Sequence, residues 1–203
     1  MIEVLFYEGI SVISKLIEWQ TRSTASHVAI RRDGVTIQSW HLPFPRGSVY
    51  LHEGPLSPFI LHTYGTVVEV FTVPRLLEAG GDGIEDRAWN WALQQVGKKY
   101  DFRMVMRFLP RWGETKGSRD KYFCSELVSM AFVVGGFPLL KRIKTAYISP
   151  GLLRVSPFLD YSYSMKADKS GGIKEWKDHK LASLDCVHDF QEAFHHEEQR
   201  AIC

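Results

Sequence analysis

The sequence predicts an α+β domain in which an antiparallel β-sheet packs against a helix that begins at a cysteine. Two patterns lead to this prediction. Runs rich in β-branched and aromatic residues indicate strands, and apolar residues at helical spacing indicate helices. The chain has 203 residues and is 45% hydrophobic, which is enough to bury one sizeable core.

The first half of the chain supplies the predicted strands. A strand at 2–7 is followed by a helix at 10–19, whose apolar face consists of Ile10, Ile13, Leu16 and Ile17. Two β-rich runs within 26–40 then meet at Arg32-Asp33-Gly34, which is a hairpin signal. A further strand at 66–74 ends at Pro74.

A helix is predicted from Ile84 to Gly97, where the apolar periodicity stops. Asp82 and Glu85 have the spacing of a capping box at its start. Trp89 and Trp91 are expected to pack against the core rather than to bind a cofactor, and we expect no cofactor and no metal ion elsewhere.

The composition divides the chain at about residue 165. Residues 1–165 are predicted to form one domain, and residues 166–203 form a polar tail with one candidate helix near 184–199. The tail contains the sequence HHEE at 195–198. Because four adjacent residues cannot all point one way from a helix, a solvated helix face is preferred to a metal site.

Charge and cysteine content exclude several classes of protein. The net charge of +2 and the pI near 8.4 are too mild for nucleic-acid binding, and the basic run at 139–144 is interpreted as a solvated turn. Three widely spaced cysteines favour a reducing compartment. The N-terminal segment has no signal-peptide pattern and no apolar run spans a membrane, so we expect a cytoplasmic protein, with export by another route left open.

Cys124 begins a predicted helix whose inward face continues with Leu127, Val128, Ala131 and Val134, before two glycines end it. A cysteine there is either a buried small side chain or a nucleophile. The unpaired amides at a helix start favour a thiolate and lower its pKa, and they could also hold an oxyanion. The base that such chemistry needs is best supplied by His27, which opens a predicted strand.

The combination of these segments resembles a known family. SHVAI is followed 97 residues later by YFCSELV, with GKKYDF between them and YISPGLL after them. Over residues 1–157 this pattern resembles the circularly permuted branch of the NlpC-type papain-like cysteine hydrolases, the YiiX/YebB-like group. The resemblance implies a papain-like fold with Cys124 as nucleophile and His27 as general base.

The resemblance also implies a third polar group on the strand after the histidine strand, usually Glu, His, Asn or Gln. If the hairpin loop is Arg32-Asp33-Gly34, His27 falls opposite Ser39. If the loop is Asp33-Gly34 alone, His27 falls opposite Trp40. We prefer the first register, and therefore Ser39 as the group that orients the imidazole, with His41 as a substitute or companion.

Four further residues are weaker candidates. His52 and Glu53 could reach the site from a loop, although solvated positions are preferred. Tyr100 and Asp101 occupy the family's Tyr-Asp position, where pocket lining competes with simple packing and turn capping.

The predicted function is that of a cysteine hydrolase that cleaves an amide bond through a thioester. The resemblance suggests a peptide, an isopeptide or a peptidoglycan stem peptide as substrate. Two alternatives stay open: a lipid acyl hydrolase or acyltransferase of the lecithin–retinol acyltransferase type, and a non-catalytic binding module on the same fold. The expected partner is a small peptide, a peptidoglycan fragment or an acylated substrate, and the oligomeric state is left open.

Overall fold

A computed structural model describes residues 1–41, 46–62, 64–78, 83–101, 121–167 and 173–175. In these ranges nine strands form one sheet in the order β7-β6-β4-β3-β2-β1-β5-β8-β9. The strands are β1 (Ile2–Glu8), β2 (His27–Arg32), β3 (Val35–Trp40), β4 (Ser48–Glu53), β5 (Val67–Thr72), β6 (Lys99–Tyr100), β7 (Lys121–Tyr122), β8 (Asp160–Ala167) and β9 (Ile173–Glu175). Neighbouring strands are antiparallel except β6 and β7, which are parallel, so the sheet is mixed rather than wholly antiparallel.

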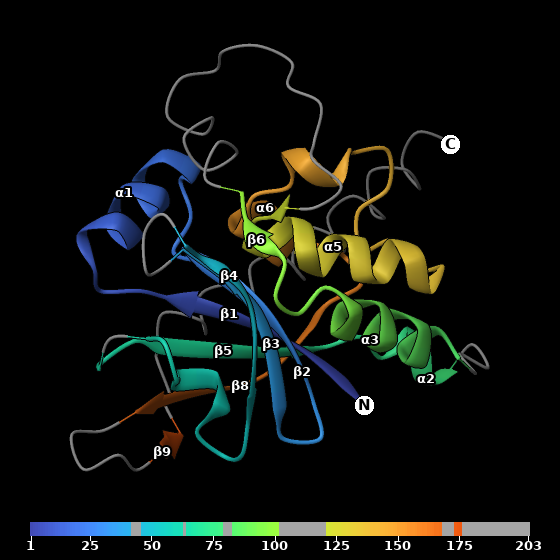
Figure 1. Cartoon of the computed structure of the whole chain (residues 1–203), viewed down its shortest axis with the longest axis horizontal. Helices are drawn as coiled ribbons and strands as arrows, with labels where there is room; N and C mark the ends of the chain where they lie inside the picture. Colours follow the sequence, from blue (N-terminus) through green and yellow to red (C-terminus); the bar gives the residue numbers. More distant parts are fainter. Residues whose placement is uncertain (42–45, 63, 79–82, 102–120, 168–172, 176–203) are drawn as a thin grey trace, which may run out of the picture.

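The helices lie around this sheet (Figure 1). They are α1 (Val12–Thr21), α2 (Arg75–Glu78), α3 (Ile84–Gln94), α5 (Cys124–Gly135) and α6 (Pro150–Arg154), with short 3₁₀ turns η1 (Ser57–Phe59) and η2 (Thr145–Tyr147). Helices α3 and α5 lie side by side and pack against each other, and α5 also contacts β2 and β3. The predicted α+β class, with a sheet against the cysteine helix, is confirmed.

Both faces of the central strands are buried. Because side chains alternate along a strand, β1 sends Val4 and Phe6 to the core shared with α3 and α5, and Leu5 and Tyr7 to the opposite face. The second face forms a smaller apolar cluster of Leu5, Tyr7, Ala29, Val68, Val70 and Met165. This two-sided burial fixes β1 and β2 in the middle of the sheet.

The β2–β3 hairpin adopts the register that the sequence analysis placed second. Arg32 pairs with Val35, and Ile30 pairs with Ile37, so the loop consists of Asp33 and Gly34 alone. Both loop residues have positive φ, 51° and 79°, as a two-residue turn that follows the sheet twist requires. The preferred register, with Ser39 opposite His27, is therefore wrong.

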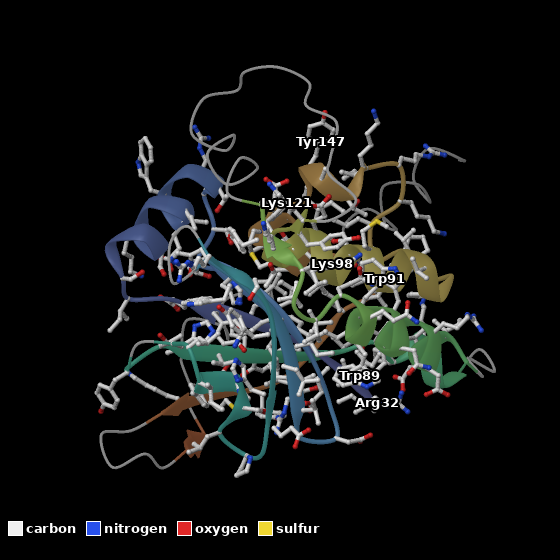
Figure 2. The ribbon with its side chains drawn as sticks, in the orientation of Figure 1. Arg32, Trp89, Trp91, Lys98, Lys121 and Tyr147 are labelled. Atoms are coloured by element: carbon white, nitrogen blue, oxygen red, sulfur yellow. The ribbon has the colours of Figure 1, made fainter. Side chains whose placement is uncertain are left out.

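Helix α3 begins one residue later than the predicted capping box requires. Its N-cap is Gly83, and Asp82 lies outside the described residues. The Glu85 carboxylate instead accepts a hydrogen bond from the Ile2 backbone N–H at 3.1 Å, which ties α3 to the start of β1. Arg32 at the end of β2 donates to Asp86 at 2.6 Å and adds a second tie on the same side of the molecule (Figure 2).

The two tryptophans of α3 pack as predicted. Trp89 is only 9% exposed and belongs to the main core. Trp91 meets the Tyr122 ring edge-on at 5.5 Å, and Lys98, just before β6, lies over the same ring at 5.5 Å, so Tyr122 of β7 contacts both α3 and the segment that follows it (Figure 2).

The predicted domain boundary at residue 165 falls inside a strand. Strand β8 runs to Ala167 and pairs with β5, and β9 at Ile173–Glu175 pairs with β8. Met165 is 4% exposed in the second apolar cluster. The sheet therefore extends past the boundary, whereas the predicted helix at 184–199 and the HHEE sequence lie outside the described residues.

No helix in the described ranges has the length and apolar character needed to cross a membrane. In the basic run at 139–144, residues 141–144 are exposed in a bend after α5, as predicted, while Leu139 at its start is buried.

Candidate active site

Cys124 is the first residue of α5 and is 5% exposed. Two hydroxyl groups fix the backbone around it. Ser39 Oγ donates to the Tyr122 carbonyl at 2.6 Å, and Ser125 Oγ donates to the Ile148 carbonyl at 2.6 Å. The start of the helix is thus fastened to β3 on one side and to the segment before α6 on the other.

A small cavity of about 30 Å³ opens beside Cys124. Its walls come from α1, the start of β2, the end of β3, β6, the start of α5 and α6. The lining residues are Ser14, Ile17, Ser26, His27, Trp40, His41, Tyr100, Phe123, Cys124 and Pro150. The volume suits a water molecule or a small reacting group rather than a whole ligand. The fold therefore brings Cys124, His27, His41 and Tyr100 to one place.

His27 is held by a glutamine that the sequence analysis did not single out. Its Nε2 atom lies 3.0 Å from Gln38 Oε1 in a buried contact. Trp40 meets the imidazole edge-on at 5.0 Å, and Tyr7 lies 5.1 Å from it on the other side. These neighbours restrict the ring to one orientation.

The corrected register explains why Gln38 reaches His27. In this register Trp40 lies opposite His27, and Gln38, two residues earlier on the same face, is its diagonal neighbour. A long side chain spans that diagonal. Glutamine is also among the residue types that the family resemblance implies for the third position, so the alternative register would have pointed to it.

Ser39 does not orient the imidazole. A shift of one residue turns every side chain of a strand to the opposite face, so Ser39 points toward α5 instead. Its hydrogen bond to the Tyr122 carbonyl supports the backbone two residues before Cys124. The site role expected for Ser39 is thus replaced by a structural one.

His41 lines the cavity, and so does one of the weaker candidates. Tyr100 is a cavity residue, but His52 and Glu53 pair with Thr36 and Val35 at the far end of β4 and do not line it. The His41 ring lies 4.8 Å from Trp40 and 6.2 Å from Tyr100. It sits at the wall as a neighbour of the site and not between His27 and Gln38.

Burial opposes ionisation at both central residues. It raises the pKa of the Cys124 thiol to about 11, although N–H groups of Val28, Ser125 and Cys124 act in the other direction. It lowers the pKa of His27 to about 3, although the hydrogen bond that His27 donates to Gln38 acts in the other direction. The N–H groups at the helix start do lower the thiol pKa, as expected, but burial outweighs them and the net shift is upward, so thiol and imidazole are both neutral in the resting protein.

An acidic pair lies beside the helix start. Glu126 is 6% exposed, and burial together with the nearby Asp101 carboxylate raises its pKa to about 7. A hydrogen bond from the Phe123 backbone acts to lower it, which is the geometry of a glutamate that caps its own helix. Asp101 and Tyr100 are buried in the same region, and burial raises the pKa of Tyr100 well above its usual value.

The molecule is thus an α+β protein with a buried cysteine and a histidine on the walls of one cavity. A scan of protein-family models finds no match, and a search of the curated proteins finds none either. Among solved structures, the chain is similar to one described as the metalloprotein YiiX from Escherichia coli O157:H7. The TM-score is 0.50, the identity is 19%, and the match covers 79% of this chain and 94% of that chain.

At this identity the likeness concerns the fold, and at that level the predicted resemblance to a YiiX-like protein is confirmed. The circularly permuted papain-like arrangement and the activity stay predictions. Within the residues that the structure describes, no group of three or more His, Cys, Asp or Glu side chains is placed to hold a metal ion.

Proposed function

We propose that the chain is a papain-like cysteine hydrolase that cleaves an amide bond through a thioester on Cys124. The observation that carries the proposal is the cavity shared by Cys124 and His27, in which Gln38 holds the imidazole from behind. A nucleophile, a base and an orienting group are the three parts that such chemistry needs.

The hydrogen bond to Gln38 assigns the roles of the two imidazole nitrogens. An amide oxygen only accepts, so Nε2 carries the proton and Nδ1 is the basic nitrogen. In the first step the thiol proton moves to Nδ1 as the sulfur attacks the carbonyl carbon. The protonated Nδ1 then gives that proton to the leaving amine as the C–N bond breaks, which leaves the acyl group on sulfur.

Water completes the reaction. Nδ1 takes a proton from a water molecule that attacks the thioester, and the C–S bond breaks to return the thiol and a carboxylic acid. Since both groups are neutral at rest, proton transfer is coupled to attack rather than completed beforehand. The N–H groups at the start of α5, including that of Ser125, are the donors for the transient oxyanion.

A second candidate function has one observation in its favour. The cavity walls include the apolar side chains Ile17, Trp40, Phe123 and Pro150, which would also suit the carbonyl end of a fatty acyl chain. A lipid acyl hydrolase or acyltransferase would use the same Cys124 and His27.

The test is a competition among peptidoglycan fragments, acylated peptides and short phospholipids. Cys124→Ala serves as the blank, and intact-protein mass spectrometry detects the acyl group on Cys124. We expect release of an amine and a Cys124-bound acyl intermediate. Fatty acid release without amide cleavage would favour the second candidate, and no acylation by any compound would leave a binding module.

A further inference from the structure

A second histidine contacts the same glutamine oxygen as His27. His62 Nε2 lies 2.9 Å from Gln38 Oε1, and its ring stacks on Tyr7 with 4.0 Å between centroids and 9° between planes. The two imidazole rings lie 5.2 Å apart. His62 follows η1, in the turn before β5, and it does not line the cavity beside Cys124.

We propose that His62 is a positioning residue: it shares the Gln38 oxygen with His27 and thereby fixes His27 in the tautomer that leaves Nδ1 to act as base. This inference rests on the proposed function, because the tautomer matters to catalysis only if His27 is the base. The sharing itself is a property of the folded protein and can be measured without any substrate.

The two ends of the Gln38 amide differ in hydrogen bonding: its oxygen accepts and its NH₂ group donates. With the amide in this orientation, the two lone pairs of its oxygen face both rings, so each ring donates from Nε2 and carries its proton there. If the amide turned round, its NH₂ group would donate to both Nε2 atoms, and both protons would have to sit on Nδ1. That arrangement would remove the base from His27.

If His27 were the only ring at Gln38, the amide could turn round and His27 could move its proton to Nδ1, and the hydrogen bond between them would still form. With His62 present, moving only the His27 proton from Nε2 to Nδ1 leaves two acceptors, Nε2 and Gln38 Oε1, facing each other. If the Gln38 amide also turns round, the hydrogen bond to His27 is kept but the hydrogen bond to His62 is lost. Each lost bond weakens that state by roughly 0.5–1.5 kcal/mol, or more when a buried group is left unsatisfied. His62 thus penalises every single-step departure from the productive tautomer.

Within the described residues, the side-chain hydrogen bonds of Gln38 are the two at Oε1. Gln38 is fully buried, and its Nε2 atom makes no hydrogen bond to any residue that the structure describes. The orientation therefore depends on the two donors at Oε1. His62 is a rigid donor, because Tyr7 covers one face of its ring and Trp40 contacts it at 4.5 Å.

The experiment uses the full chain labelled with ¹⁵N-histidine, observed by NMR at pH 7. In the unmodified protein, His27 and His62 must both appear as Nε2–H tautomers, with signals assigned from the His27→Ala and His62→Phe spectra. A dominant Nδ1–H form of either ring overturns the proposal. This first measurement needs no variant other than those used for assignment.

Two variants and a control then test the dependence. His62→Phe keeps a ring to stack on Tyr7 but removes the donor, so His27 should become a mixture of tautomers. His62→Gln restores a donor and should restore the single tautomer. Tyr64→Phe, at an exposed ring two residues after His62, should leave His27 unchanged. An unaltered His27 tautomer in folded His62→Phe overturns the proposal.

Activity supplies an independent readout. In His62→Phe we expect kcat to fall about 10-fold and KM to stay within about twofold, with recovery in His62→Gln, because orientation and not substrate binding is lost. If the tautomer changes as expected but no compound acylates Cys124, the proposed function fails while the shared hydrogen bond stands. If turnover occurs and the tautomer is unaffected, the function stands and this inference fails.

Discussion

Cys124 and His27 have pKa shifts of opposite sign that share one physical origin. Each side chain is buried at the cavity, and burial disfavours the charged form of either group. The pKa of the thiol rises to about 11 and that of the imidazole falls to about 3. The neutral pair is therefore the resting state, and in the proposed mechanism a substrate carbonyl draws the proton across.

This state predicts an unusual alkylation profile for Cys124. With a pKa of about 11, only about one thiol in ten thousand is ionised at pH 7. The iodoacetamide rate at Cys124 should rise about tenfold per pH unit between pH 7 and 10. Mass spectrometry of the modified peptides separates Cys124 from Cys186 and Cys203, and Cys124→Ala confirms the assignment. A rate that levels off below pH 9 would show that the thiol is acidic after all.

Glu126 predicts a pH-dependent stability. Its pKa is about 7 in the folded chain against a reference value of 4.5, so the folded state binds the proton more tightly. Stability from this group is present below pH 4.5 and is lost as the pH rises through about 7. The loss amounts to about 3 kcal/mol at most.

Glu126→Gln should remove this pH dependence, because glutamine can still accept from the Phe123 N–H but cannot ionise. We expect the variant to match the parent near pH 4.5 and to unfold at higher urea concentration at pH 8. The matched control is Glu53→Gln, an exposed residue on β4, which should not alter the slope. Parallel curves for parent and Glu126→Gln would contradict the assignment.

Side-chain chemistry allowed part of the site to be predicted from the sequence. Cys124, His27 and His41 all line the cavity. Cys124 and His27 could be predicted because a helix start and a strand start can be identified from local patterns. Gln38 was missed because its role depends on a one-residue choice of hairpin register. His62 could not be found, since it lies in a turn and reaches the site only through the folded sheet.

At the level of elements, the junction between β1 and α1 is tightly packed. The Gly9 backbone N–H donates to Ser26 Oγ at 3.1 Å, and Ser26 Oγ donates to the Tyr7 carbonyl at 3.1 Å. A side chain at Gly9 would overlap Ser14 and press on Ser26. Ser14 and Ser26 both line the cavity, so the residues that pack around Gly9 at the start of α1 also form part of the cavity wall.

Gly9→Ala should therefore lower both stability and activity. Displacing Ser14 and Ser26 is overpacking, which typically costs about 1–3 kcal/mol, and it disturbs the wall next to His27. Gly54→Ala is the matched control: Gly54 has φ +94° with open space around it, so it should lose about 1 kcal/mol and keep its activity. Thermal unfolding and turnover measured on both variants decide the point. Equal activity loss in the two would mean that stability alone is responsible.

The elements differed in how well their patterns predicted them. Helices α3 and α5 and strands β1 and β5 have strong periodicity and stop signals, and all four were predicted. Strands β4 and β8 were missed, because SVYLHE and DYSYSMKA mix polar and aromatic residues and become strands only by pairing with neighbours. Tertiary pairing, which no local window contains, decided those segments.

For the whole molecule, the extent of the sheet predicts where the chain can be shortened. A chain that ends at Glu175 keeps every contact of the described structure, including β9 on β8. We expect it to unfold cooperatively with a midpoint close to that of the full chain. A chain that ends at Leu159 loses β8 and uncovers β5, and we expect it not to fold.

Met165→Ala provides a milder comparison in the full chain. Met165 is 4% exposed on the second face of the sheet, and its truncation should cost about 2–5 kcal/mol. Circular dichroism and urea unfolding of the three proteins test the series. Cooperative unfolding of the chain that ends at Leu159 would show that β8 is an accessory strand.

The strand order also determines when each pair of strands can form during synthesis. Strands β2, β3 and β4 follow one another along the chain and pair in that order, so they can form as soon as they leave the ribosome. Strand β5 pairs with β1 early but waits for β8, which is made almost a hundred residues later. At translation rates of roughly 5–20 residues per second, the outer edge of β5 stays open for roughly 5–20 s. During that interval Val68 and Val70 lack their contact with Met165, and we expect the unpaired edge of β5 to be the part of the nascent sheet most prone to aggregation.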